Sequence, residues 1–137
     1  MPSVTKSVDL ERSQEEAFSL ATDPARFEEW LTLHAGWPDG PPASVAEGDS
    51  FKQKLTIMGM PADVAWTVSE RTDSRLVMTG AGPMGATLGT TITADGGTVS
   101  YEAEFSGGGI QGPMGDMVTK KAGEEIEISL GKLQALA

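Results

Sequence analysis

Apolar residues recur at every second position along most of the chain after residue 50, which is the spacing of half-buried β-strands. Five such segments follow one another. Their apolar faces are formed by Phe51, Leu55 and Ile57 with Gln53, by Val64, Trp66 and Val68, by Leu76 and Met78, by Ala86, Leu88 and Ile92, and by Val99, Tyr101, Ala103 and Phe105. Polar residues fill the alternate positions. The pattern therefore predicts an antiparallel sheet with one buried and one solvated face.

The segment before residue 50 predicts a strand and two short helices. Val4–Leu10 alternates between apolar and polar residues, as a half-buried strand does. Ser13 and Glu16 form a capping-box pattern, so we expect a helix that begins there and runs for about two turns. Asp23-Pro24 indicates a second helix, because Asp caps helix N-termini and proline at the first helical position loses no hydrogen bond.

The second helix is followed by a proline-rich loop. Phe27 and Trp30 recur at helical spacing, and His34 is expected at the end of this helix. Residues 36–48 contain three prolines and predict a loop with room for one short edge strand. We expect Trp30 to pack the two short helices onto the core, whereas Trp37 is either exposed or covers a pocket.

A long amphipathic helix is predicted from Pro113 to the C-terminus. Its apolar residues fit a period of about 3.6 and form one stripe. The stripe consists of Met114, Met117, Val118, Ala122, Ile126, Leu130, Leu133 and Leu136. Gly123 and Gly131 each weaken a helix by about 1 kcal/mol relative to alanine, so this helix depends on packing against the sheet.

The connections that follow the predicted strands alternate in character. Residues 58–61, 82–85 and 107–115 are rich in glycine, proline and methionine, whereas residues 71–74 and 95–97 are short and polar. Every second turn of an up-and-down antiparallel sheet lies at the same end, so the methionine-bearing loops should gather at one end. Flexible apolar side chains suit the mouth of an adaptable hydrophobic pocket there, although the same methionines could simply plug that end.

Four short segments carry a resemblance to a known family: residues 13–17, Asp23-Pro24 followed by Trp30, residues 65–68 and residues 97–101. With the order of the predicted elements, they resemble the START-like superfamily, also called SRPBCC, in its small bacterial polyketide cyclase/dehydrase branch. The resemblance implies an α+β helix-grip fold, in which a curved antiparallel sheet of six or seven strands wraps around a long C-terminal helix. It also implies one domain over residues 1–137.

In this family a cavity lies between the sheet and the long helix, so the resemblance implies a hydrophobic, lipid- or polyketide-like ligand. We expect the body of the cavity to be lined by Gln53, Val64, Trp66, Met78, Leu88 and Tyr101, and its mouth by Met58, Met60, Met84, Met114 and Met117. The superfamily contains carriers, cyclases and hydrolases, so the fold does not fix the function. The alternatives are a polyketide cyclase or dehydratase and a toxin-like interaction module of a toxin–antitoxin pair.

The sequence leaves more than one role open for several polar and aromatic residues. Gln53 marks a strand end, a polar neighbour or a hydrogen-bond donor in a pocket, because an unpaired buried amide costs about 1–3 kcal/mol. Trp66 and Tyr101 contact a ligand or belong to the plain core. His34, the single histidine, is a surface or capping residue or a proton-transfer group. The catalytic residues are unknown, and with no acid–base pair visible an enzyme ranks below a binding protein.

The amino-acid composition excludes several classes of binding partner. Twenty acidic residues against ten basic ones give a formal net charge of −10, which repels the phosphates of nucleic acids. Cysteine is absent, which excludes disulfides and fits a cytoplasmic protein, and one histidine cannot build a metal site. No apolar run approaches the ~20 residues that span a bilayer. We therefore expect no metal, cofactor, nucleic acid or membrane span, while a homodimer or a basic protein partner stays open.

Overall fold

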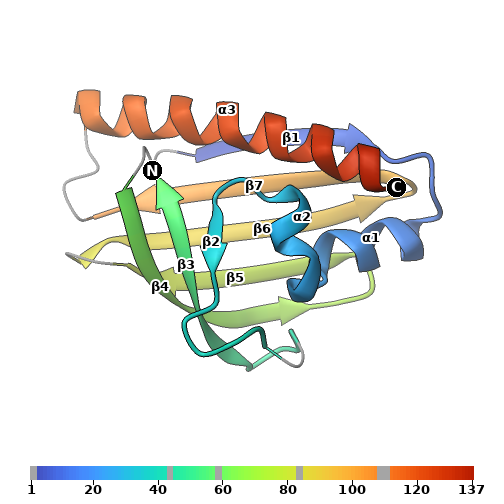
Figure 1. Ribbon diagram of the computed structural model, residues 1–137, viewed down its shortest axis with the longest axis horizontal. Helices are drawn as coiled ribbons and strands as arrows, with labels where there is room; N and C mark the ends of the chain where they lie inside the picture. The colour runs from blue at the N-terminus through green and yellow to red at the C-terminus, as the bar shows by residue number, and fades with distance from the viewer. Residues whose placement is uncertain (1–2, 43–44, 58–59, 83–84, 108–111) are drawn as a thin grey trace.

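Within the described residues, seven strands form a single antiparallel sheet in the order β1-β7-β6-β5-β4-β3-β2 (Figure 1). The strands are β1 (Ser3–Asp9), β2 (His34–Gly36), β3 (Ser50–Ile57), β4 (Met60–Arg71), β5 (Arg75–Ala81), β6 (Thr87–Asp95) and β7 (Thr98–Ser106). The computed structural model describes residues 3–42, 45–57, 60–82, 85–107 and 112–137, without the side chains of residues 57, 60 and 112–114. The up-and-down order of β3 to β7 is the one that the alternating pattern predicts.

The helices of the described chain are α1 (Gln14–Thr22), the 3-10 helix η1 (Pro24–Arg26), α2 (Phe27–Trp30) and α3 (Gly112–Leu136). The predicted caps are confirmed. The Oγ of Ser13 accepts from the backbone N–H of Glu16 at 3.1 Å, and the Asp23 carboxylate accepts from the N–H of Ala25 at 3.1 Å. None of the described helices is both long and apolar enough to cross a bilayer.

Burial confirms the predicted faces of the sheet. On β6 and β7 every second residue is buried, and Val64, Trp66 and Val68 of β4 are buried in the same way. These residues form one core cluster with the buried residues of α3. The sheet therefore curls around α3 and the short helices, and the fold is the predicted α+β helix-grip (Figure 1).

The buried stripe of α3 is confirmed for Val118, Ala122, Ile126, Leu130 and Leu133. The assignment of Met117 to this stripe is wrong, because its side chain is 55% exposed and lies beside Lys120 and Lys121. Met117 precedes the stripe by one residue, which is about 100° around the helix. Gly123 faces β1, where a Cβ would lie 3.0 Å from Cγ2 of Val4, so glycine at this position lets α3 approach the strand closely.

The second helix ends earlier than the sequence pattern predicts. α2 stops at Trp30, and His34, expected at the end of a helix, instead begins the short edge strand β2. The cause is tertiary, because the backbone N–H of Thr32 donates to Oγ of Ser129 on α3 at 2.9 Å instead of continuing the helix. The chain then pairs with β3 at the edge of the sheet.

The turns after β4 and β6 lie at one end of the sheet, and the C-terminal ends of β3, β5 and β7 lie at the other, as the alternation predicts (Figure 1). The predicted hairpin after Asp95 is present, with Gly96 in the left-handed region at φ +61°. Met58 and Met84 lie outside the described residues, and the side chains of Met60 and Met114 are not described. The mouth that these methionines should form stays a prediction.

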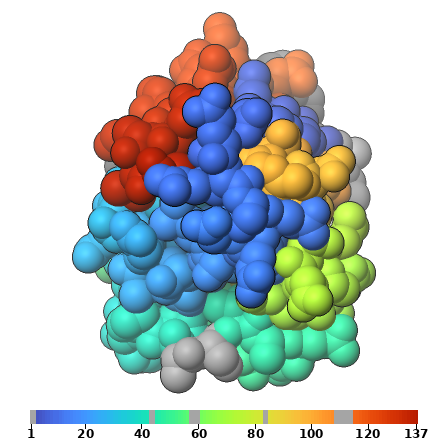
Figure 2. Space-filling view, turned by 90° about the vertical axis from the view of Figure 1, so that its right-hand side faces the viewer, coloured from blue at the N-terminus to red at the C-terminus, as the bar shows by residue number. Residues whose placement is uncertain are grey.

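The end with the polar turns is covered by α1. Figure 2 views this end and shows α1 (blue) between the C-terminal part of α3 (red) and the turns after β4 (yellow-green) and β6 (gold). The side chain of Gln14 accepts from the N–H of Gly96 at 3.1 Å, and the guanidinium of Arg71 lies 5.0 Å from the centre of the Phe18 ring. Helix α1 therefore closes this end of the curled sheet.

Candidate functional site

Three side chains on neighbouring strands form a hydrogen-bonded chain. The indole Nε1–H of Trp66 on β4 donates to Oε1 of Gln53 on β3 at 2.9 Å. The Nε2 of Gln53 lies 2.8 Å from Nδ1 of His34 on β2. Gln53 is 3% exposed. Of the roles that the sequence left open for Gln53, the structure shows the polar neighbour, and there are two of them.

The chemistry of these groups fixes the direction of the chain. An indole N–H can only donate, so the atom of Gln53 that faces Trp66 is the carbonyl oxygen. The amide nitrogen of Gln53 therefore faces His34 and donates, and Nδ1 of His34 accepts. A neutral His34 then carries its proton on Nε2. In this tautomer His34 can donate from Nε2 but cannot act as a general base there.

Burial also favours the neutral form of His34. The side chain is half-buried, and desolvation lowers the pKa of His34 from its ordinary value, while the nearby Glu28 carboxylate opposes the shift. Protonation would place a second N–H against the amide of Gln53 and break their hydrogen bond. Desolvation and the hydrogen bond from Gln53 therefore both favour the neutral form of His34.

A second polar group lies on β6 and β7. Tyr101 is buried, and its hydroxyl lies near the side chain of Thr90. Burial raises the pKa of Tyr101 to about 12, although the neighbouring Thr90 side chain opposes the shift. The ring of Trp30 on α2 meets the Tyr101 ring edge-on, with centroids 6.4 Å apart. Tyr101 is therefore a neutral hydroxyl at physiological pH.

Trp30 carries a buried donor without a protein acceptor. Its side chain is 1% exposed, and within the described part of the chain its Nε1–H has no hydrogen-bond partner. An unpaired buried donor costs about 1–3 kcal/mol. Such groups are uncommon in native proteins. Because an indole N–H only donates, the group that would satisfy it is an acceptor.

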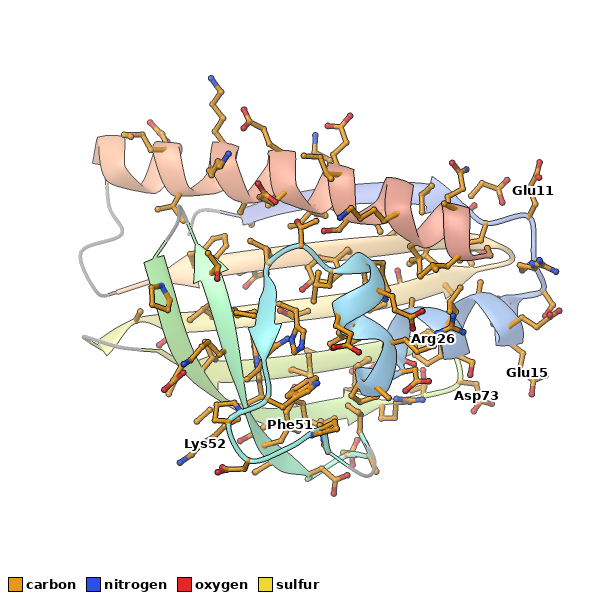
Figure 3. The ribbon with its side chains drawn as sticks, in the orientation of Figure 1. Glu11, Glu15, Arg26, Phe51, Lys52 and Asp73 are labelled. Atoms are coloured by element: carbon orange, nitrogen blue, oxygen red, sulfur yellow. The ribbon has the colours of Figure 1, made fainter. Side chains whose placement is uncertain are left out.

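Aromatic rings from α2, β2, the following loop and β3 pack together beside Trp30. We call Phe27, His34, Trp37 and Phe51 the aromatic cover. Trp37 stacks on Phe27 with centroids 5.8 Å apart and contacts His34 at 4.8 Å. Phe51 approaches Trp37 edge-on at 5.8 Å, while the adjacent Lys52 points away from the sheet (Figure 3). The half-buried Trp37 thus covers the edge of the sheet where His34 and Gln53 meet.

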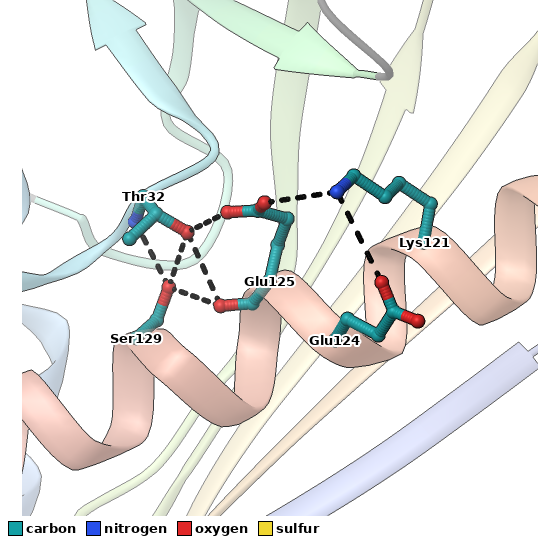
Figure 4. A network of polar contacts seen from close by, with 5 residues as sticks. All are labelled: Thr32, Lys121, Glu124, Glu125 and Ser129. Atoms are coloured by element: carbon teal, nitrogen blue, oxygen red, sulfur yellow. Dashed lines mark hydrogen bonds and ion pairs between the residues drawn. The ribbon is translucent and has the colours of Figure 1, made fainter.

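A polar network fastens the segment between α2 and β2 to α3 (Figure 4). We call Thr32, Glu125 and Ser129 the latch. The hydroxyl of Thr32 donates to the Glu125 carboxylate at 2.6 Å, and the Oγ of Ser129 donates to the backbone carbonyl of Glu125 at 2.7 Å. Lys121 lies 3.6 Å from the same carboxylate. The latch holds Trp30 and the aromatic cover against α3.

Several clefts open on the surface of the described residues. One of about 630 Å³ lies between residues 39–42 and strands β3 and β4, with Phe51 in its lining. Another of about 600 Å³ lies at the α1 end beside Phe18 and Arg71. The core cluster occupies the space between the sheet and α3, so a ligand there requires side chains to move. In the described part of the chain, no three His, Asp or Glu side chains are grouped closely enough to hold a metal ion.

The structure brings the residues predicted for the cavity body onto one buried face. Val64, Trp66, Met78, Leu88 and Tyr101 are between 0% and 7% exposed, and Gln53 joins them. Met117, predicted for the mouth, lies on the outer surface of α3 and not with this group. Contact of these residues with a ligand stays a prediction.

The sequence pattern missed two polar groups of this face. Thr90 is buried at an inward position between Leu88 and Ile92, so the period of two contained the signal, which a run of neighbouring threonines concealed. Trp30 is buried, as predicted. No sequence pattern, however, shows that its Nε1–H lacks an acceptor, because that depends on every side chain packed around it.

The strand order, the capped short helices and the long C-terminal helix define a helix-grip protein of the START-like, or SRPBCC, class. Residues 1–137 match the family described as "Polyketide cyclase / dehydrase and lipid transport". The chain belongs to this family, and the resemblance seen in the sequence is confirmed.

Several known proteins are similar to the chain over nearly all of its length. Toxin Rv0910 from Mycobacterium tuberculosis is 27% identical over 135 residues, which cover 95% of this chain and 94% of that protein. A START superfamily protein from Mycobacterium smegmatis has a TM-score of 0.66 at 19% identity, with 97% of this chain and 94% of that chain covered. TTHA0849 from Thermus thermophilus has a TM-score of 0.73 at 16% identity, with 98% and 95% covered. The two structural similarities show a shared fold.

Proposed function

We propose that this protein binds a hydrophobic, lipid- or polyketide-like small molecule between the concave face of the sheet and α3. The observation that carries the proposal is a set of buried polar groups: Gln53, Thr90 and Tyr101 on this otherwise apolar face, and the indole N–H of Trp30, which packs against it from α2. A buried polar group costs free energy unless it is hydrogen-bonded, and the Nε1–H of Trp30 has no partner in the described part of the chain. In a binding site, a few polar groups among apolar side chains orient the ligand.

The ligand would displace the most adaptable part of the core. Val64, Trp66, Met78, Leu88 and Tyr101 would line the body, and Met58, Met60, Met84 and Met114 the mouth. Methionine suits this role because its unbranched side chain repacks at low cost. The α1 end is closed by packed side chains, so access from the methionine-bearing end is the simpler route (Figure 2).

Native mass spectrometry of the protein as purified tests the proposal. An additional apolar mass that disappears under denaturing conditions is expected. Methyl NMR supplies the location, because Met78 is 4% exposed in the core and Met117 is 55% exposed on the outer surface of α3. A ligand in the interior shifts the Met78 methyl and leaves Met117 unchanged. A clean apo mass, with no shift of Met78 by a panel of lipids and aromatic compounds, would refute the proposal.

A toxin-like interaction module is the second candidate, and the similarity to Toxin Rv0910 favours it. Glu11, Glu15 and Asp73 are exposed and project from the α1 end (Figure 3), where they would suit a basic protein partner. Growth arrest on expression, relieved when the three residues are replaced by Gln, Gln and Asn, would support this function. Unimpaired growth on expression of the wild-type protein would exclude this function.

An enzyme of the cyclase or dehydratase type receives less support. His34 and Gln53 converge, but they bind each other, and Tyr101 lies near Thr90 and is not hydrogen-bonded to either of them. In the tautomer that Gln53 imposes, His34 cannot accept a proton at Nε2. The polar groups of this face are therefore better arranged to bind a ligand than to transfer its protons.

A further inference from the structure

We propose that Trp30 is the polar anchor of the ligand and that its Nε1–H donates a hydrogen bond to a neutral carbonyl oxygen of an otherwise apolar molecule. The inference rests on the proposed function and names the ligand class: a ketone, ester, quinone or amide with a large apolar body. The geometry points to Trp30 because it carries a buried polar side-chain atom without a partner in the described chain.

The other polar groups of the face are already engaged. The oxygen and nitrogen of the Gln53 amide bind Trp66 and His34, and the hydroxyl of Tyr101 lies near the side chain of Thr90 and is not among the buried atoms without a partner. A ligand group that replaced any of these bonds would gain one hydrogen bond and lose another. An acceptor placed at Trp30 gains a bond at no such loss, because the donor is already desolvated and unpaired.

The position of Trp30 places the carbonyl deep in the fold. Its ring packs edge-on against Tyr101 on the concave face and against Phe27 of the aromatic cover, with centroids 6.4 Å and 5.8 Å apart. Neither of the two surface clefts described above has Trp30 in its lining. A molecule that reaches this N–H therefore lies in the interior of the fold, against the concave face of the sheet.

The surroundings select a neutral acceptor over a carboxylate. The interior disfavours charge of either sign, since burial raises the pKa of Tyr101 and lowers that of His34. Several cations of the surrounding elements are paired with other groups: Arg71 with the Val45 carbonyl and the Phe18 ring, Arg26 with Glu29, Lys6 with Glu127, and Lys121 with Glu124 and Glu125. A buried carboxylate without a cation is strongly disfavoured.

Three probes of nearly equal size separate the possibilities: 2-acetylnaphthalene, 2-ethylnaphthalene and 2-naphthoate. They share one ring system and carry a neutral acceptor, no acceptor and an anion. The chain has three tryptophans, so ¹H–¹⁵N spectra contain three indole cross-peaks, which Trp30→Phe and Trp37→Phe assign. We expect the acetyl probe to bind about fivefold more tightly than the ethyl probe, the value of one neutral hydrogen bond. We expect 2-naphthoate to bind no more tightly than the ethyl probe.

The Trp30 indole proton should shift downfield with the acetyl probe and much less with the ethyl probe, while the Trp66 proton keeps its bond to Gln53. Trp30→Phe should abolish the preference for the acetyl probe, and Trp37→Phe should retain it. Equal affinities with an unmoved Trp30 cross-peak, or tightest binding of 2-naphthoate, would overturn the inference and leave the proposed function intact. If Trp30→Phe does not fold, nuclear Overhauser contacts with the Tyr101 ring assign the Trp30 cross-peak of the wild-type protein, and its shift with the acetyl probe then tests the inference. Absence of any Met78 shift with all three probes and with lipids would refute both proposals.

Discussion

The indole Nε1–H of Trp66 lies 2.9 Å from Oε1 of Gln53, and this contact determines the proton position on a third side chain. Because the indole can only donate, the amide of Gln53 has one orientation, and Nδ1 of His34 must accept from it. Three strands thereby share one oriented polar chain. The protonation state of His34 on the edge strand therefore depends on two residues that lie deeper in the sheet.

Protonation of His34 should destabilise the fold as the pH falls below about 6.5, the ordinary pKa of histidine. The folded protein has the lower pKa, so between the two values the unfolded chain binds more protons and the free energy of unfolding decreases as the pH decreases. Above that range His34 contributes no pH dependence. Denaturation from pH 7.5 to 5.5 and an NMR titration of the single histidine measure this. The His34→Gln variant should lose this decrease in the free energy of unfolding between pH 7.5 and 5.5. A His34 pKa above 6.5 in the folded protein would contradict the proposed cause.

Gln53→Glu should raise the pKa of His34. A carboxylate at this position can accept from both Nδ1–H of His34 and Nε1–H of Trp66, so it favours the imidazolium form that Gln53 opposes. Gln53→Met is the matched control of similar length, which removes the donor without adding charge. In the same titration the Gln53→Glu variant should show the highest His34 pKa of the three proteins. An unchanged value in that variant would show that the Gln53 contact does not set the protonation state.

Gly80→Ala should lower the free energy of unfolding by about 1–3 kcal/mol through overpacking. Gly80 is buried on β5, where a Cβ would lie 2.5 Å from Cγ1 of Val64 and 2.8 Å from Cε3 of Trp66. Gly89→Ala on β6 is the control, because its Cβ meets Glu104 at an ordinary 3.6 Å. Urea denaturation compares the two variants. Equal stabilities would mean that Gly80 does not make room for the Trp66 ring.

Gly131→Ala should raise the free energy of unfolding by about 1 kcal/mol, the difference in helix propensity. A Cβ at Gly131 on α3 meets nothing within 4 Å. Gly123→Ala on the same helix should gain less, because its Cβ would crowd Val4 of β1 at 3.0 Å. Chemical denaturation of the pair separates propensity from packing, and an equal gain at both sites would refute close packing between α3 and β1.

Ser129→Ala should cost about 1–3 kcal/mol, because it leaves the backbone N–H of Thr32 without its acceptor in a part-buried position. Ser129 itself is 0% exposed. Ser19→Ala on the exposed side of α1 is the control and should change stability by less than about 0.5 kcal/mol. Hydrogen exchange of residues 31–36 should accelerate in Ser129→Ala alone. Unchanged protection there would show that the latch does not hold this segment.

The sequence determined the fold through local patterns that tertiary contacts reinforced. The period of two placed Val64, Trp66, Leu88 and Tyr101 on one buried face, and each is buried. Ser13 and Asp23 marked helix starts because capping is a contact between residues two or three apart. Residues that share a strand face or a helix turn can be read from spacing alone.

Tertiary structure decided the features that depend on contacts between distant segments. Thr32 meets Ser129 across 97 positions, and that bond ends α2 early and places His34 on a strand. Met117 faces solvent because α3 packs against β1 through the side of the helix that carries Gly123, and this packing fixes which residues of the stripe are buried. The tautomer of His34 and the unpaired donor of Trp30 arise in the same way. Hydrogen bonding in a core depends on every group that packing brings within reach, and spacing along the chain does not contain that information.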